Sequence, residues 1–200
     1  MIKVPKGNTQ KDVSAEVFKI LDSSEPRSLA TIIDVPCGDG TFAKFLKDSF
    51  PEAHVVGVDK FCEVPDRRIE FFKLGAQDFF RSQCPKNIDA ITSISGVMCF
   101  DVTEELLSLV HAALKKNGLV VITNDNIMTV RDKLNFLFFS HFKRFKLTFA
   151  KHEGNWNLLL PQAVYMLLER HNFRVQSIRY TSIYVEDWIF LPYTILKILR

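Results

Sequence analysis

Two glycines and an acidic residue stand at a spacing that suits the binding of a nucleoside. The apolar run 29–35 is typical of a buried strand, and it leads into a turn that contains Gly38 and Gly40. Because glycine has no Cβ atom, these residues allow a tight turn and the close approach of a ligand. A second apolar run ends at Asp59, 19 residues after Gly40, where a carboxylate can accept hydrogen bonds from both ribose hydroxyls. The order strand, glycine turn, helix, strand and acid therefore predicts a site for a cofactor that contains a nucleoside.

Strands and helices alternate along the chain, and this alternation predicts how the glycine turn is held. Apolar strands between amphipathic helices predict an α/β fold, in which helices cover both faces of a mainly parallel, doubly wound sheet. At 200 residues the chain has the length of about one domain, here expected to span 1–200. The expected strands are 29–35, 54–59, 69–73, 88–95, 119–123 and 174–180, and helices are expected over 10–22, through Phe42 to Leu46, from Asp101 through Leu114 and from Pro161 through Leu168.

The kind of cofactor depends on the acids around the glycine turn. Gly38, Gly40 and Ala43 fit the spacing of the dinucleotide fingerprint, so a nicotinamide-dependent oxidoreductase is one alternative. Asp34 stands before the glycines, where its charge would repel a pyrophosphate but not a positively charged sulfonium cofactor. Asp78 follows the third expected strand, where it can hold an adenine amino group while the neighbouring Phe79 packs on the ring. These acids favour the sulfonium cofactor.

The stretches IIDVPCGDG, HVVGVD, LGAQDFF, IDAITSISGVMCF and LVVIT together resemble the class I S-adenosylmethionine-dependent methyltransferases over residues 28–125. The resemblance implies a Rossmann-like, seven-stranded sheet whose last strand is reversed, and S-adenosyl-L-methionine as cofactor. It implies that Asp34, Gly38 and Gly40 hold the methionine part, that Asp59 holds the ribose and that Asp78 contacts adenine. Pro36 stands where glycine is commoner in the family. The remaining residues of the expected cofactor site are Pro36, Cys37, Lys60, Phe79 and Ser95.

The chain after residue 125 is similar to bacterial methyltransferases encoded with genes for cell-surface polysaccharides. Its segment 131–151 combines six phenylalanines with six basic residues and one acid, Asp132, which gives a formal charge of +5. Because this segment follows the fifth expected strand at the ligand-binding edge, we expect 126–160 to form an inserted lid over the acceptor. The expected acceptor is a small molecule or a glycan, and the basic charge favours an anionic one.

Methyl transfer to oxygen or nitrogen is an in-line displacement, so the main task of the protein is to align the acceptor with the methyl group. A base is needed only where the acceptor must lose a proton early. Histidine is the side chain best suited to proton transfer near neutral pH, and Asp125 follows the fifth expected strand, so His141, His152 and Asp125 are the catalytic candidates. A protein that binds the cofactor without turnover remains a second alternative.

Composition argues against several other classes of protein. The net charge is only +3, which disfavours a nucleic-acid binder. The four cysteines lie 25, 22 and 15 residues apart without a C-x-x-C pair, so we expect no metal site and reduced thiols in the cytoplasm. The segment 188–199 is densely apolar and carries Trp188, Tyr193 and Lys197. It is expected to pack as core or to make peripheral contact with a membrane.

Overall fold

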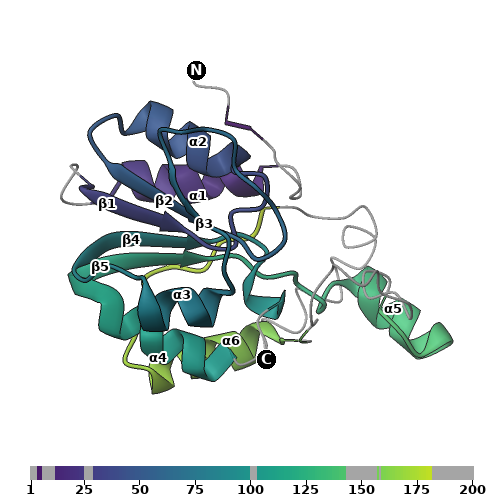
Figure 1. The fold of residues 1–200 in the computed structure, drawn as a ribbon. Coiled ribbons are helices and arrows are strands. Elements are labelled where there is room, and N and C mark those ends of the chain that lie inside the picture. Colours follow the sequence, from purple (N-terminus) through teal and green to yellow (C-terminus); the bar gives the residue numbers. More distant parts are fainter. Residues whose placement is uncertain are drawn as a thin grey trace.

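The computed structural model describes residues 4–5, 12–24, 29–99, 103–142, 157 and 159–181. They form one parallel five-stranded sheet with the strand order β3-β2-β1-β4-β5 (Figure 1). The strands are β1 (Thr31–Asp34), β2 (His54–Val58), β3 (Glu70–Phe72), β4 (Ile88–Ser93) and β5 (Leu114–Ile122). The helices are α1 (Val13–Asp22), α2 (Thr41–Ser49), α3 (Ala76–Ser82), α4 (Thr103–Ala113), α5 (Val130–Phe139) and α6 (Pro161–Arg170), with a short 3-10 turn η1 (Val97–Cys99).

The central strand β1 is paired on both sides. Ile32 lies opposite Val55 of β2 and Ala90 of β4, and all these pairings are parallel. From β1 the chain proceeds outward to β2 and β3, and it then returns to place β4 on the other side of β1. The strand order therefore reverses at β1 and β4, and in open α/β sheets the crevice at such a reversal binds ligands.

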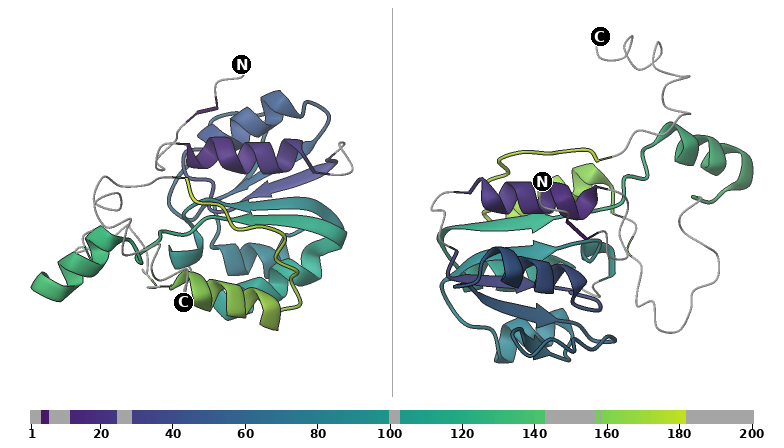
Figure 2. Two further views of the ribbon diagram at one scale, coloured as in Figure 1. Left: turned by 180° about the vertical axis from the view of Figure 1, so that it is seen from behind. Right: turned by 90° about the horizontal axis from the view of Figure 1, so that it is seen from above.

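Helices cover both faces of the sheet, with α1 and α2 on one side and α3, α4 and α6 on the other (Figures 1 and 2). Successive residues of β1 point to opposite faces. Ile32 accordingly packs with Phe18 and Leu46 of the first helical layer. Ile33 packs with Phe79 and Val110 of the second layer. These two apolar clusters hold the strand ends at fixed positions.

The structure confirms the α/β class and the first four expected strands, although each is slightly shorter than expected. The fifth strand begins earlier than the expected residue 119. Ile88 pairs with Leu114 and Ala90 pairs with Leu119, so β5 contains an irregularity at which residues 115–118 have no counterpart in β4. As a result α4 ends at Ala113, before Leu114 and before the helix stop that was expected near Asn117 and Gly118.

The expected count of seven strands is wrong for the part of the chain that the structure describes, which has five. Residues 174–180 were expected to be the sixth strand, but they run without strand pairing, and Ile178 and Tyr180 are exposed. Apolar alternation produces a strand only where a neighbouring strand accepts its hydrogen bonds. Residues 182–200, which include the apolar segment 188–199, lie outside the described residues. The whole-chain domain assignment therefore remains a prediction.

Phe79 also differs from its expected role as a platform for adenine. Its ring is fully buried between the sheet and α3, 5.1 Å from the ring of Phe72 and 5.3 Å from that of Phe80. The helical spacing of α3 turns Phe79 toward the sheet, whereas Asp78 is exposed. Phe79 is therefore part of the core.

If Phe79 belongs to the core, its substitution should lower the stability of the protein and should leave the affinity for the cofactor unchanged. Phe79→Ala should lower the free energy of unfolding by about 3–5 kcal/mol, because it leaves a cavity in a packed layer. Phe79→Leu should cost less, about 1 kcal/mol, and should leave cofactor affinity unchanged. Urea unfolding and calorimetric titration measure the two quantities. Normal stability with reduced affinity in Phe79→Leu would instead return Phe79 to the cofactor site.

Candidate cofactor site

The turn after β1 supplies the open backbone surface that the glycine spacing predicts. Gly38 and Gly40 have φ values of +57° and +76°, which non-glycine residues rarely adopt. A Cβ atom added at Gly38 would meet no atom within 4 Å, whereas one at Gly40 would lie 2.6 Å from Cγ1 of Val64. Gly38 therefore borders open space, and Gly40 is needed for close packing. The turn leads directly into α2, which begins at Thr41.

Asp59 joins the glycine turn to the segment that follows β2. Its Oδ2 accepts a hydrogen bond of 2.9 Å from the backbone N–H of Gly38. Its Oδ1 accepts bonds of 2.8 Å from the N–H groups of Phe61 and Cys62. Asp59 is buried, with 7% of the residue exposed. The structure thus brings together Gly38 and Asp59, the two residues whose spacing first predicted a site.

Asp34 is a buried acid at the end of β1. Only 2% of the residue is exposed, and its Oδ1 accepts a hydrogen bond of 2.7 Å from Oγ1 of Thr92. Burial raises the pKa of Asp34 to about 7, and the negative charge of Asp59 acts in the same direction, whereas the bond from Thr92 opposes the rise. Near neutral pH this carboxyl group is therefore balanced between its neutral and ionised forms, and a neighbouring cation would favour the ionised form.

Thr92 and Ser93 are site residues that the sequence analysis missed. Thr92 lies directly opposite Asp34 in the pairing of β1 with β4, which places its hydroxyl beside the carboxylate. Ser93 follows it, and its buried Oγ has no hydrogen-bond partner. Both stand at the end of an apolar strand that adjoins the glycine turn. Once β1 and β4 are recognised as neighbouring strands, the polar residues Thr92 and Ser93 at the end of the apolar strand β4 are the sequence signal that could have indicated them as part of the site.

The turn after β4 packs directly against Pro36. A Cβ atom added at Gly96 would lie 2.0 Å from Cδ of Pro36 and 2.8 Å from Oγ of Ser93, so only glycine fits there. Ser95 lies beside this contact, and its backbone N–H donates to Oγ1 of Thr123 at 2.8 Å. Pro36 and Ser95 therefore stand at the same edge of the sheet, where β1, β4 and β5 end.

Cys37 occupies the middle of the turn as a structural residue. Its N–H donates to the carbonyl oxygen of Val58 at 2.9 Å, and its side chain is buried against Gly57. Burial is the largest cause of a strongly raised thiol pKa, and the charges of Asp34 and Asp59 raise it further. The thiol stays protonated at neutral pH and is a poor nucleophile.

Two expected cofactor residues lie at the surface. Asp78 is exposed in the first turn of α3, with Oδ1 at 3.6 Å from Nη1 of Arg81. Lys60 is exposed, and its Nζ lies 5.7 Å from the ring centroid of Phe61. Their contacts with the cofactor remain predictions.

The structure describes two of the three catalytic candidates, Asp125 and His141. Asp125 is half-buried in the segment that leaves β5. His141 follows α5, and its Nδ1 lies 2.9 Å from the carbonyl oxygen of Phe139, to which it donates. His152 lies outside the described residues. Figure 2 shows α5 extending away from the sheet, so the described part of 126–160 does not cover the glycine turn, and its role as a lid remains a prediction.

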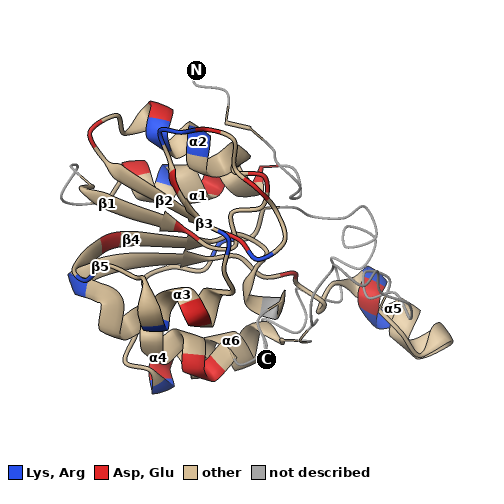
Figure 3. Cartoon of the chain, viewed as in Figure 1, with Lys and Arg blue, Asp and Glu red and all other residues tan. Residues whose placement is uncertain are grey.

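Among the described residues no group of three or more His, Cys, Asp and Glu side chains is arranged to hold a metal ion. The charged side chains of the α/β body are of both signs and are interspersed (Figure 3). The features that distinguish the edge of the sheet are therefore the buried acids Asp34 and Asp59 beside the open backbone at Gly38.

The sequence matches the methyltransferase domain family over residues 8–178, and the chain belongs to this family. A curated relative, 2-ketoarginine methyltransferase from Streptomyces arginensis, is 30% identical over 117 residues, which covers 53% of this chain. This chain spans only 35% of that relative's length. The family expected from the sequence is confirmed, and the match favours a methyltransferase over a nicotinamide-dependent enzyme.

Solved structures show the same fold. The SAM-dependent methyltransferase from Archaeoglobus fulgidus has a TM-score of 0.62 at 19% identity, with 94% of this chain and 86% of that chain covered. Phosphoethanolamine N-methyltransferase 2 from Haemonchus contortus, solved in complex with S-adenosyl-L-methionine, has a TM-score of 0.55 at 17% identity. That match covers 78% of this chain and 36% of the other. The Rossmann-like methyltransferase fold is thereby confirmed.

The raised pKa of Asp34 predicts a specific dependence of stability on pH. Between about pH 4 and 7 the folded protein holds a proton on Asp34 that the unfolded chain has lost, so this group destabilises the fold as the pH rises through that range. Asp34→Asn removes the effect and keeps an oxygen acceptor for Thr92. Its melting temperature relative to the wild type should therefore be higher at pH 8 than at pH 5, by about 2–4 °C for each kcal/mol.

Thermal unfolding without cofactor at the two pH values measures this difference, and Glu63→Gln, an exposed acid after β2, serves as the control. An equal effect of Asp34→Asn at both pH values would show that Asp34 is ionised throughout.

Proposed function

We propose that this protein transfers a methyl group from S-adenosylmethionine to a small-molecule acceptor. The observation that carries the proposal is the hydrogen bond from Gly38 N–H to Asp59 Oδ2, which joins an open glycine turn to a buried carboxylate at the strand reversal. When bound, the cofactor supplies an electrophilic methyl group on a sulfonium centre. The residues of this chain bind it, orient it and keep water from it.

Asp59 is suited to bind the ribose, but the hydrogen bonds that it already accepts limit how many ribose hydroxyls it can bind. A carboxylate has about four lone-pair positions. Three are filled by the N–H groups of Gly38, Phe61 and Cys62, which leaves one position on Oδ2. Asp59 therefore accepts one ribose hydroxyl in this arrangement. Acceptance of both hydroxyls requires the release of one backbone donor.

Asp34 and Gly38 are suited to the methionine part. The open space beside Gly38 admits a ligand to the backbone, and the neighbouring acid of β1 is neutral or ionised at little cost near pH 7. A bound cation stabilises the ionised form of Asp34. Thr92 then donates to the carboxylate and keeps it in position. This arrangement favours a sulfonium and ammonium ligand over a pyrophosphate.

A small-molecule acceptor is supported by the names of relatives. One is named for 2-ketoarginine and another for phosphoethanolamine. An anionic acceptor, a glycan among them, is supported by the formal charge of +5 over 131–151. Transfer to oxygen or nitrogen, with Asp125, His141 or His152 as base, belongs to the same proposal, as does a lid formed by 126–160.

Cofactor binding tests the assignment of Asp59. The wild-type protein should bind S-adenosylmethionine and not NAD. Asp59→Asn should weaken that binding by about 10- to 100-fold, which corresponds to the 1.5–3 kcal/mol of a hydrogen bond to a charged group. Isothermal titration calorimetry measures both, and Glu63→Gln should bind like the wild type because its side chain is exposed. Unchanged affinity in Asp59→Asn would remove the ribose assignment.

Turnover is tested separately with labelled methyl groups. The protein is mixed with labelled S-adenosylmethionine and fractionated cell extract, and transfer into a low-molecular-weight fraction is expected. Binding without transfer to any fraction would favour the non-catalytic alternative.

A further inference from the structure

Helix α5 is fixed at its first turn and extends from the body at its last (Figures 1 and 2). Asp132 is buried in the first turn, and Thr129 caps the helix by accepting a bond of 3.1 Å from the N–H of Asp132. Ile127, just before the helix, is buried against Cys99 and Phe142. The helix ends at Phe139, and the residue that caps it, Ser140, has a φ of +58°. The base of α5 is therefore held and its tip is presented outward.

The tip of α5 is apolar around its whole circumference. Four successive residues, Phe136, Leu137, Phe138 and Phe139, are between 52% and 72% exposed. Successive residues of a helix are about 100° apart, so four of them point in all directions around the axis. A groove on another protein covers one face of a helix and would leave part of this ring in water. Only a medium that surrounds the tip removes the entire ring from water.

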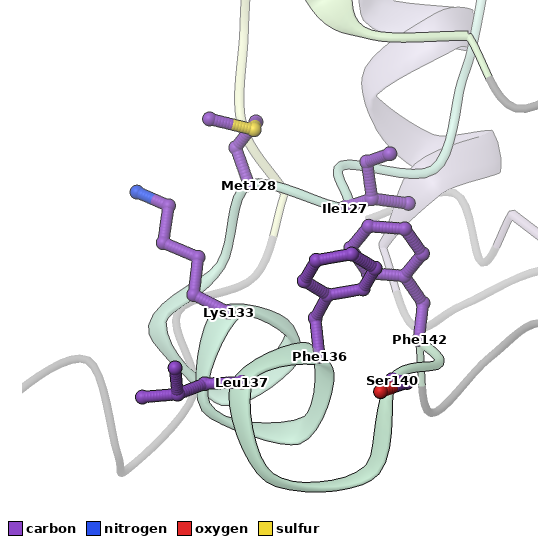
Figure 4. A pocket seen from close by; sticks show the side chains of 7 residues that line it. All are labelled: Ile127, Met128, Lys133, Phe136, Leu137, Ser140 and Phe142. Atoms are coloured by element: carbon purple, nitrogen blue, oxygen red, sulfur yellow. The ribbon is translucent and has the colours of Figure 1, made fainter.

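An open hollow of about 620 Å³ lies beside the tip (Figure 4). Phe136 and Phe142 stack within it at 5.1 Å, while the side chain of Lys133 points away from the two rings. The lining is mainly apolar, so it suits a hydrocarbon chain, and Lys133 supplies one positive charge at its side. The lining residues are Ile127, Met128, Lys133, Phe136, Leu137, Ser140 and Phe142.

Positive charge accompanies the apolar tip in the sequence. In the first half of α5 Lys133 is exposed, whereas Arg131 is mostly buried and its Nη2 lies 3.8 Å from Oδ2 of Asp132. The segment 131–151 carries a formal charge of +5, against +3 for the whole chain. The other residues therefore sum to −2. In Figure 3 the charged residues of α5 are in the part of the helix nearest the body, and the tip carries none. Basic residues next to an exposed aromatic cluster complement an anionic lipid surface.

We propose that the tip of α5 inserts into the surface of an anionic lipid bilayer. Phe136 to Phe139 enter the boundary between headgroups and acyl chains, and the exposed Lys133 at the side of the helix faces the headgroups. In the described part of the chain no helix has the length and apolarity needed to cross a bilayer. Helix α5 has 10 residues and is thus about 15 Å long, which suits contact with one leaflet. This inference does not depend on the proposed methyl transfer.

Co-sedimentation with vesicles tests the proposal on the full chain, without cofactor. The wild type should bind vesicles of phosphatidylcholine with phosphatidylglycerol at low salt, bind less as salt rises and bind little to phosphatidylcholine alone. Leu137→Gln with Phe138→Gln should lower the partition coefficient about tenfold or more, because two apolar side chains no longer enter the lipid. The matched control, Met166→Gln with Ile178→Gln, removes two similarly exposed apolar side chains elsewhere and should bind like the wild type.

Several outcomes would overturn the proposal. The absence of wild-type binding, or equal binding by the tip variant, would exclude insertion of α5. Equal binding to both kinds of vesicle would exclude an anionic surface as the partner. A wild-type dimer that dissociates in the tip variant, measured by ultracentrifugation, would show that a second copy covers the tip. A melting temperature lowered in the tip variant and not in the control would show that this chain itself covers it.

Discussion

The parallel pairing of β1 between β2 and β4 is the constraint on which the candidate site depends. It brings the glycine turn after β1 beside Asp59 at the end of β2, and it brings Asp34 beside Thr92 of β4. Because parallel strands all end at one edge, polar groups from three separate stretches of sequence meet without any long loop to carry them. The two apolar clusters on the faces of the sheet then hold these strand ends in register.

Much of this arrangement could be predicted from the sequence because its signals are local. The glycine turn, the apolar strands and the acid at residue 59 each follow from a few neighbouring residues. Thr92 could not be found in this way, since its role depends on which strands are neighbours. Phe79 was misassigned because adjacency to Asp78 in the sequence hides the 100° rotation between successive helical residues. The strand expected at 174–180 failed because a strand depends on a partner that its own sequence does not specify.

The candidate cofactor site and helix α5 differ in how far their side chains are buried and partnered. At the candidate cofactor site the carboxylates of Asp34 and Asp59 are buried and hydrogen-bonded, so their geometry is fixed without a ligand. Beyond β5 the chain instead exposes a ring of large apolar side chains on α5. Rigid sites of the first kind favour orientation of a reacting group. Exposed apolar surface such as that of α5 is typical of a region that binds a membrane or another protein.

The bonds to Asp59 have a consequence for the dynamics of the loops around it. Amide protons in surface loops usually exchange rapidly with solvent, because local opening of such loops costs little free energy. The amides of Gly38, Phe61 and Cys62 are different, since each donates to a carboxylate that is itself almost fully buried. Their protons can exchange only when the carboxylate loses its donors. We therefore expect these loop amides to exchange more slowly than those of other surface loops, as amides within the sheet do.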